Sequence, residues 1–279
     1  MIDSKRYRAL SGMITNTVLD LFDRTIPNQF IRNVVILSGT TIVAQGLTVL
    51  ASPIISRLYT PGELGILSIF MSLVNMAWVF SSGRYESAVS FTRKDDDAFH
   101  IVVLSMIILT ASSFAFFVAL LVWGSGLISL LGLEPLRPYI LLIPFGIIGL
   151  GAYQIGSYWP IRKRTYGLFA RTKVWQSIGQ VLVQIIGGLM KAGAVGLIVG
   201  DIVGRSSGSF SLFKRIWHDK RTSGIILSPR TLARLAWRYR RFPLFSTWSS
   251  FLLTIASSGV PLILGKYYGL PVLGFVGLV

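Results

Sequence analysis

Long apolar runs separated by short, basic segments dominate the chain. A helix needs roughly 20 apolar residues to cross about 30 Å of hydrocarbon, so each run of that length without charged residues or His predicts a transmembrane helix. Seven segments fit, the sixth interrupted by Asp201 and Arg205: 33–56, 64–83, 101–133, 139–161, 174–190, 192–213 and 242–265. The pattern therefore predicts an all-α integral membrane protein.

Three of these segments need further interpretation. The third is too long for one simple span, and we expect the Gly-Ser-Gly sequence at 124–126 to end its helix. The fifth is short, and Lys173 and Lys191 at its two ends can extend it by snorkelling to the interface. After the seventh, residues 267–279 rise only about 20 Å as a helix, so an eighth span begins and we interpret the chain as incomplete.

Composition supports a membrane location and narrows the chemistry. Hydrophobic residues make up 52% of the chain and charged residues only 14%, well below the quarter that is usual in soluble domains. The net charge of +16 comes from residues between the apolar runs, which argues against nucleic acid as a partner. Cysteine is absent and there are two histidines, so we expect no metal site and no cofactor.

The distribution of Lys and Arg predicts the orientation. With the N-terminus in the cytoplasm, 23 of the 27 Lys and Arg residues lie on the cytoplasmic side of the predicted helices. The other four are Arg57, Arg137, Lys191 and Lys266. Because cytoplasmic loops carry the excess of basic residues, a multi-pass topology with a cytoplasmic N-terminus follows.

A weak internal repeat suggests two bundles. Pro53 to Tyr59 and Pro261 to Tyr267 have the same spacing, and a Leu-Gly pair follows in each copy, with a one-residue offset. We therefore divide the chain into four parts: a cytoplasmic N-terminal segment that can form an interfacial helix, a six-helix N-terminal lobe, a basic cytoplasmic linker, and the first one to two helices of an incomplete second lobe. Their boundaries are 1–29, 30–213, 214–241 and 242–279.

The sixth predicted helix carries the most informative polar residues. Asp201 and Arg205 stand four residues apart and share one face, so they form either a structural ion pair or a site where Arg205 binds an anionic cargo and Asp201 couples transport to an ion. Glycines recur every fourth residue from Gly196 to Gly208, which is typical of close helix packing. The two charges are then free to face an adjacent space.

Other polar residues give further candidates for binding cargo. Gln176, Gln180 and Gln184 form a row on the fifth helix, and Gln45 lies in the first; amides can bind sugar hydroxyls or link neighbouring helices. Arg84 at the cytoplasmic end of the second helix can bind phosphate or pair locally with Glu86.

Other segments count against enzymatic chemistry. The acidic triplet 95–97 is expected to be a solvated loop, and no phosphate-binding loop for ATP occurs. The basic segment around 230–241 has interleaved apolar residues and predicts an interfacial helix on anionic lipid.

Several short motifs resemble one family. They are Arg57-Leu-Tyr-Thr-Pro61 with Leu64-Gly65, Arg84-Tyr-Glu86, the acidic segment 94–98, and Arg241-Phe-Pro243. In this order they resemble the lipid-linked oligosaccharide flippases that export O-antigen and capsule repeat units, within the multidrug/oligosaccharidyl-lipid/polysaccharide exporter superfamily. The resemblance covers roughly 30–279, whereas most of the second lobe is absent.

The resemblance implies a function as well as a fold. It implies two six-helix lobes around a central cavity, a polyprenyl-diphosphate-linked glycan as cargo, and a bacterial inner-membrane location. Membrane lipids and other polysaccharide-assembly proteins are the further partners to expect. The alternatives are a multidrug exporter of the same superfamily, a membrane-embedded glycan-biosynthesis enzyme, and a non-functional truncated remnant. A transporter rather than an enzyme is favoured, because neither catalytic carboxylates nor a large extramembrane loop is evident.

Overall fold

The computed structural model describes residues 29–278. The prediction made for segment 1–29 lies outside the described residues, apart from Gln29. Within the described part, every regular element is helical, and five helices are long and apolar enough to cross a membrane. The predicted all-α membrane fold is therefore confirmed.

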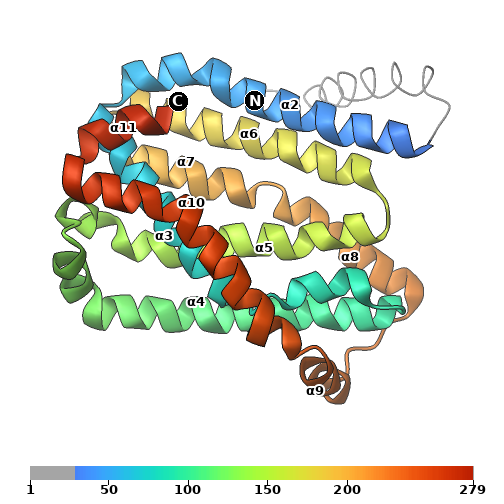
Figure 1. The fold of residues 1–279 in the computed structure, drawn as a ribbon. Coiled ribbons are helices and arrows are strands. Elements are labelled where there is room, and N and C mark those ends of the chain that lie inside the picture. Colours follow the sequence, from blue (N-terminus) through green and yellow to red (C-terminus); the bar gives the residue numbers. More distant parts are fainter. Residues whose placement is uncertain (1–28, 279) are drawn as a thin grey trace.

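The helices run back and forth between two ends of the molecule (Figure 1). The principal ones are α2 (Gln29–Leu58), α3 (Pro61–Ser81), α4 (Asp95–Leu131), α5 (Ile143–Arg162), α6 (Tyr166–Leu189), α7 (Ala194–Ser206), α8 (Ser209–Ser223), α9 (Pro229–Arg238), α10 (Thr247–Tyr268) and α11 (Leu270–Leu278). Three shorter helical turns connect them: η1 (Tyr85–Phe91), η2 (Glu134–Leu142) and η3 (Phe242–Ser246).

The five membrane-crossing candidates are fewer than the seven spans predicted. They are Ser38–Leu58, Pro61–Ser81, Asp95–Gly124, Glu134–Arg162 and Phe242–Tyr268. The fifth predicted span lies in α6, a longer helix that contains three glutamines and two basic residues, and the sixth begins with α7, which has only 13 residues. Both nevertheless lie alongside the other helices (Figure 1).

Two predicted helix boundaries were wrong. The helix α4 does not end at 124–126 but continues to Leu131, and Gly132 (φ 69°) then ends it in the left-handed conformation. A Cβ on Gly124 would lie 3.5 Å from the Ile140 side chain, so η2 packs over this part of α4. Tertiary packing thus offsets the low helix propensity of glycine. The sixth predicted helix divides between Ser206 and Ser209 into α7 and α8.

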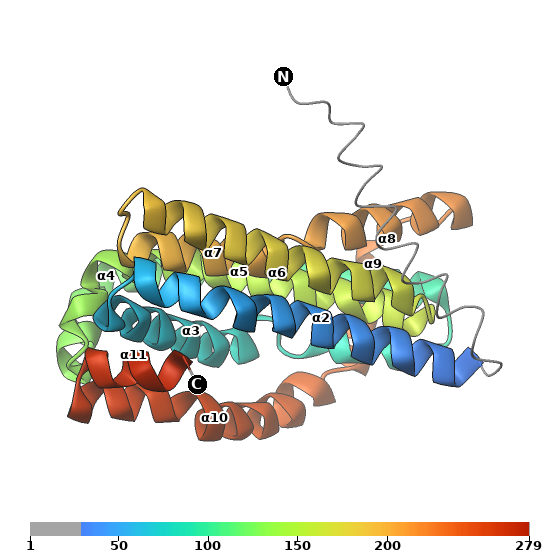
Figure 2. The same ribbon diagram turned by 90° about the horizontal axis from the view of Figure 1, so that it is seen from above.

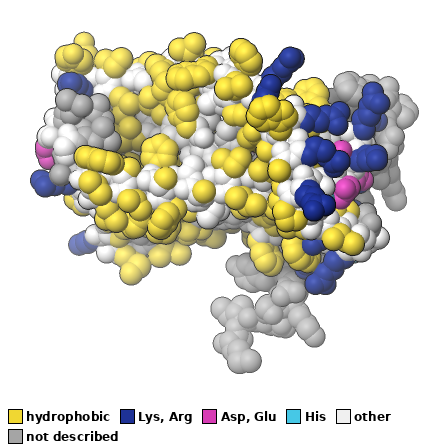
Figure 3. All heavy atoms as spheres, turned by 90° about the horizontal axis from the view of Figure 1, so that it is seen from below, with side chains coloured by type: hydrophobic (Ala, Val, Ile, Leu, Met, Phe, Trp, Pro, Cys, Tyr) yellow, Lys and Arg dark blue, Asp and Glu magenta, His cyan; other side chains and the backbone are white. Residues whose placement is uncertain are grey.

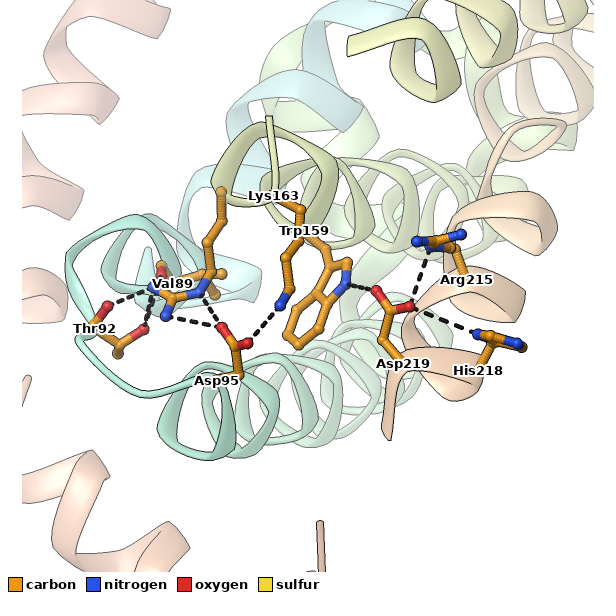
Figure 4. Close-up of polar contacts among 9 residues, drawn as sticks. Val89, Thr92, Asp95, Trp159, Lys163, Arg215, His218 and Asp219 are labelled. Carbon is orange, nitrogen blue, oxygen red and sulfur yellow. Dashed lines mark hydrogen bonds and ion pairs between the residues drawn. The ribbon is translucent and has the colours of Figure 1, made fainter. Parts of the chain in front are cut away.

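The acidic triplet 95–97 is also not a loop, because it forms the first turn of α4. The Arg162 side chain, at the end of α5, donates to Asp95 Oδ1 (3.1 Å), to Thr92 Oγ1 (2.9 Å) and to the carbonyl of Val89 (3.1 Å). Lys163 forms a second ion pair with Asp95 (Figure 4). One arginine therefore joins η1, α4 and α5.

The turn between α2 and α3 explains one of the family motifs. Thr60 and Glu63 cap α3 reciprocally: the Thr60 N–H donates to Glu63 Oε2 (2.7 Å), and the Glu63 N–H donates to Thr60 Oγ1 (3.3 Å). The Tyr59 hydroxyl donates to the carbonyl of Gln184 on α6 (2.6 Å). The motif therefore has a structural role, since it starts α3 and holds it against α6.

Glycines bring α6 and α7 into close contact. The predicted glycine ridge on α7 faces α6: Gly200 lies against Gln184 and Gly204 lies against Gln180. The two backbones approach most closely at Gly187 and Gly196, where a Cβ on Gly187 would lie 2.7 Å from the Cα of Gly196. No larger side chain fits there without separating the two helices.

The two copies of the internal repeat meet in the structure. The helices α10 and α11 lie together on one side of the bundle and contact α3 (Figure 2). Gly65 of the first copy lies against the backbone of Leu270, and Gly274 of the second copy lies against the backbone of Pro61. Residues 61 and 270 hold equivalent positions in the repeat, four before each glycine. This reciprocal contact is what a local two-fold relation between α3 and α11 produces.

The two ends of the molecule differ in charge. Lys and Arg side chains gather at the end where α8 and α9 lie, which we call the basic end (Figure 3). The opposite end contains the α2–α3 turn and the α3–α11 contact. On the face shown in Figure 3, apolar side chains predominate between the two ends, as a bilayer requires.

The close α6–α7 contact predicts that one added methyl group at a glycine of this contact lowers stability. A Cβ on Gly196 would lie 2.6 Å from Tyr59 Oη and 3.0 Å from the Cα of Gly187, so Gly196→Ala should lower stability by about 1–3 kcal/mol. Gly46→Ala is the matched control, because a Cβ there meets nothing within 4 Å. Thermal unfolding in detergent measures both, and equal midpoints for the two variants would contradict the close contact.

Candidate functional site

A cavity of about 440 Å³, with several polar side chains in its wall, lies between α2, α6 and α7. Its wall consists of Thr41, Ala44, Gln45, Thr48 and Val49 from α2, Lys173, Gln176, Ser177 and Gln180 from α6, and Gly204 and Arg205 from α7. The cavity lies beside the middle of α2 and of α6 and beside the last turn of α7. It lies among helices of the N-terminal lobe, whereas the resemblance implied a cavity between two lobes.

Arg205 is the central charged group of the cavity wall. Its Nε donates to Asp201 Oδ2 (2.7 Å), and its Nη1 donates to Asn75 Oδ1 on α3 (3.1 Å). The carbonyl of Arg205 accepts a hydrogen bond from Gln176 Nε2 (2.8 Å). The guanidinium group is therefore held between α7 and α3, and Gln176 links the Arg205 backbone to α6.

Asp201 is sealed inside the bundle. It is 1% exposed and does not line the cavity, whereas the Arg205 side chain is 17% exposed. The structural ion pair considered for these two residues is thus present, and Arg205 is also on the cavity wall. Because the carboxylate faces inward, the described part of the wall has cationic but no acidic side chains.

The glutamine row divides into two parts. Gln176 and Gln180 line the cavity, together with Gln45 from the opposite helix. Gln184 is 3% exposed, and its amide donates to the Leu197 carbonyl (3.4 Å). Gln45, Gln180 and Arg205 are therefore brought together as cargo candidates, while Gln184 is placed in helix packing.

Arg84 lies away from the cavity, before η1 at the basic end. Its Nη1 is 3.8 Å from Glu86 Oε1, so the local pair considered as an alternative to phosphate binding is present. Glu86 is fully buried, and this burial raises the pKa of its carboxyl group. Arg84 thus partly neutralises an interior acid.

Sequence reasoning missed two residues of the site. Lys173 was assigned to snorkelling, yet it lines the cavity, with its Nζ 4.9 Å from the centroid of the Tyr153 ring. The spacing Lys173, Gln176, Gln180 places all three on one helix face, which could have indicated this role. Nothing in the sequence indicated that Asn75 belongs to the site, because it is a single amide within an apolar run.

The fold and the cavity define a multi-pass, all-α membrane protein with a polar, cationic site among its helices. Residues 54–278 match the family model described as polysaccharide biosynthesis protein. The match covers more than half of the chain, so the chain belongs to this family. No curated protein and no solved structure matches it.

The Asp201–Arg205 ion pair predicts that replacing the arginine lowers stability more than replacing the aspartate does. Arg205→Gln leaves Asp201 charged and buried, so it should lower stability by about 3–5 kcal/mol. Asp201→Asn should lower stability by less, because Arg205 keeps its hydrogen bond to Asn75 and its side chain also reaches the cavity. In the double variant, Asp201→Asn removes the buried charge, so it should recover much of the loss. Unfolding midpoints in detergent test this order, and a double variant as unstable as Arg205→Gln would refute it.

Proposed function

We propose that this protein moves a polyprenyl-diphosphate-linked oligosaccharide across the bacterial cytoplasmic membrane for surface polysaccharide biosynthesis. The observation that carries the proposal is the cavity wall, which combines two cations and three glutamine amides without an acidic residue among its described members. The N-terminus and the basic end would face the cytoplasm, following the distribution of Lys and Arg.

The chemistry of the wall suits this cargo. Guanidinium and ammonium groups bind phosphate oxygens through charge-assisted hydrogen bonds, which are the strong ones. Amides supply both donors and acceptors for sugar hydroxyls. Moving these groups through hydrocarbon without partners would cost several kcal/mol each. A polar cavity removes that barrier while the polyprenyl chain stays in the lipid.

The position of the cavity supports alternating access. The cavity lies beside the middle of α2 and α6, and the close glycine contact between α3 and α11 lies at the end opposite the basic end. In the proposed cycle, cargo enters the cavity from the cytoplasm, and α3 and α11 then separate to release it. The Asp201–Arg205 pair would open as the phosphates bind Arg205, leaving Asp201 to take up a proton or a cation.

Two rival functions fit the wall less well. An exporter of cationic drugs would need acidic side chains in its cavity, and Asp201 is sealed by Arg205. A glycan-synthesising enzyme would need a carboxylate next to bound substrate, which the described wall lacks. Both rivals predict that the lipid-linked glycan is not moved unchanged from one leaflet to the other.

Lys173 provides the direct test. Lys173→Gln removes one phosphate contact worth about 1.5–3 kcal/mol, so apparent transport should fall roughly tenfold or more. Transport is measured as restored surface glycan, when the reading frame that encodes this chain is expressed in a flippase-null strain with a matched repeat unit.

Arg171→Gln is the matched control, because Arg171 is exposed on the same helix and does not line the cavity. It should leave transport unchanged. Correct membrane insertion of the parent protein without any return of surface glycan would count against the proposal, as would equal effects of the two substitutions.

A disulfide can test the proposed separation of α3 and α11. The chain has no cysteine, and an ideal Cβ on Gly277 lies 3.9 Å from Ser68 Cβ, which is close to the spacing in disulfides. In the Ser68→Cys/Gly277→Cys variant, oxidation should stop transport and reduction should restore it. The single-cysteine variants are the controls, and continued transport in fully cross-linked protein would exclude the separation.

A further inference from the structure

An apolar groove of about 740 Å³ runs along the outside of the bundle between α4 and α8. Ten of its eleven lining residues are apolar, including Phe99, Met106 and Phe114 on α4 and Phe213 and Trp217 on α8. The exception is Thr110, whose hydroxyl donates to the Met106 carbonyl (2.9 Å) and is therefore already satisfied. The groove thus offers a hydrocarbon-like surface.

The groove is long enough to cross one leaflet of a bilayer. From Phe99 to Phe114 the helix rises about 22 Å, at roughly 1.5 Å per residue. Half of the hydrocarbon core is about 15 Å thick. A chain that starts at the basic end can therefore lie in the groove down to the middle of the membrane.

The ammonium group of Lys220 lies at the basic end of the groove. The Nζ of Lys220 is 4.4 Å from the ring centroid of Trp217 and 5.3 Å from that of Phe99, and both rings line the groove. Among the described residues, no carboxylate lies within 4.0 Å of this ammonium group.

The nearest acid in the sequence does not neutralise Lys220. Asp219 accepts hydrogen bonds from Trp159 Nε1 (2.9 Å) and pairs with Arg215 (3.1 Å) (Figure 4). The charge of Lys220 is therefore available to an anion whose apolar part occupies the groove.

We propose that this groove binds an anionic membrane phospholipid, with its phosphate on Lys220 and one acyl chain between α4 and α8. The polyprenyl chain of the cargo is a poorer occupant. The cavity is lined by α2, α6 and α7, and it shares no residue with the groove. A lipid bound here would hold α8, and with it the linker to α10, against α4. This site does not depend on the proposed transport function.

Lipid retention by the purified chain tests the site. Native mass spectrometry of detergent-solubilised protein would be used, with phosphatidylglycerol and phosphatidylcholine of identical acyl chains. We expect one phosphatidylglycerol to be retained in preference to phosphatidylcholine. Lys220→Gln should reduce that preference about fivefold, the effect of one lysine near an anionic head group. Arg221→Gln is the control, because Arg221 is exposed and does not line the groove.

A second variant tests the apolar part separately. Ala111 lines the groove and is exposed, so Ala111→Phe fills the groove without entering the core. It should weaken retention of both lipids, while size-exclusion profiles stay unchanged. The proposal would be overturned if the parent retained the two lipids equally, or if the Lys220 and Arg221 substitutions had equal effects. Unchanged binding to Ala111→Phe would overturn it as well, and so would displacement of the lipid by an equimolar polyprenyl phosphate.

Discussion

The close contact between α6 and α7 is the interaction on which the site depends. Glycines on α7 let the two backbones approach until Gly187 and Gly196 touch, and the glutamines of α6 then lie directly over the glycine ridge. This spacing places Gln180 and Arg205 on one wall and directs Asp201 inward. A larger side chain on the ridge would separate the helices and with them the polar groups. Packing and polar chemistry are therefore set by the same few residues.

The burial of one acid determines the charge of the cavity. Asp201 is buried and paired with Arg205, so it balances the charge of that arginine from inside the bundle and places no negative group on the cavity wall. Because an unpaired charge inside the bundle would be costly, the pair makes a guanidinium group possible at this depth. The wall that remains suits phosphate and sugar, and this is consistent with membership in a polysaccharide biosynthesis family.

The two ends of the molecule are held together by different means. At the basic end, Arg162 and Lys163 bind Asp95, so charged side chains connect the end of α5 to the start of α4. At the opposite end, the helix backbones themselves are in contact. Gly65 lies against the backbone of Leu270, and Gly274 lies against the backbone of Pro61. Contacts without long side chains can part and re-form with little rearrangement, which suits the separation proposed for α3 and α11. The apolar groove beside α8 adds a place where the membrane itself can stabilise the basic end.

Hydropathy and charge along the chain were enough to predict an all-α membrane protein and the glycine ridge as a packing surface, because each depends on residues close in sequence. For Asp201 and Arg205 the sequence left two interpretations open, because it defines only the helix face that they share. The end of α4 and the position of 95–97 in a helix could not be predicted, since packing from η2 and α5 decides them. The division of the sixth span into α7 and α8 was not predicted either. The same holds for the site. Only the tertiary structure places Lys173 and Asn75 beside Arg205 and removes Gln184 and Arg84 from the cavity. Periodicity defines the face of a helix, but the neighbour that this face meets depends on contacts across more than a hundred residues.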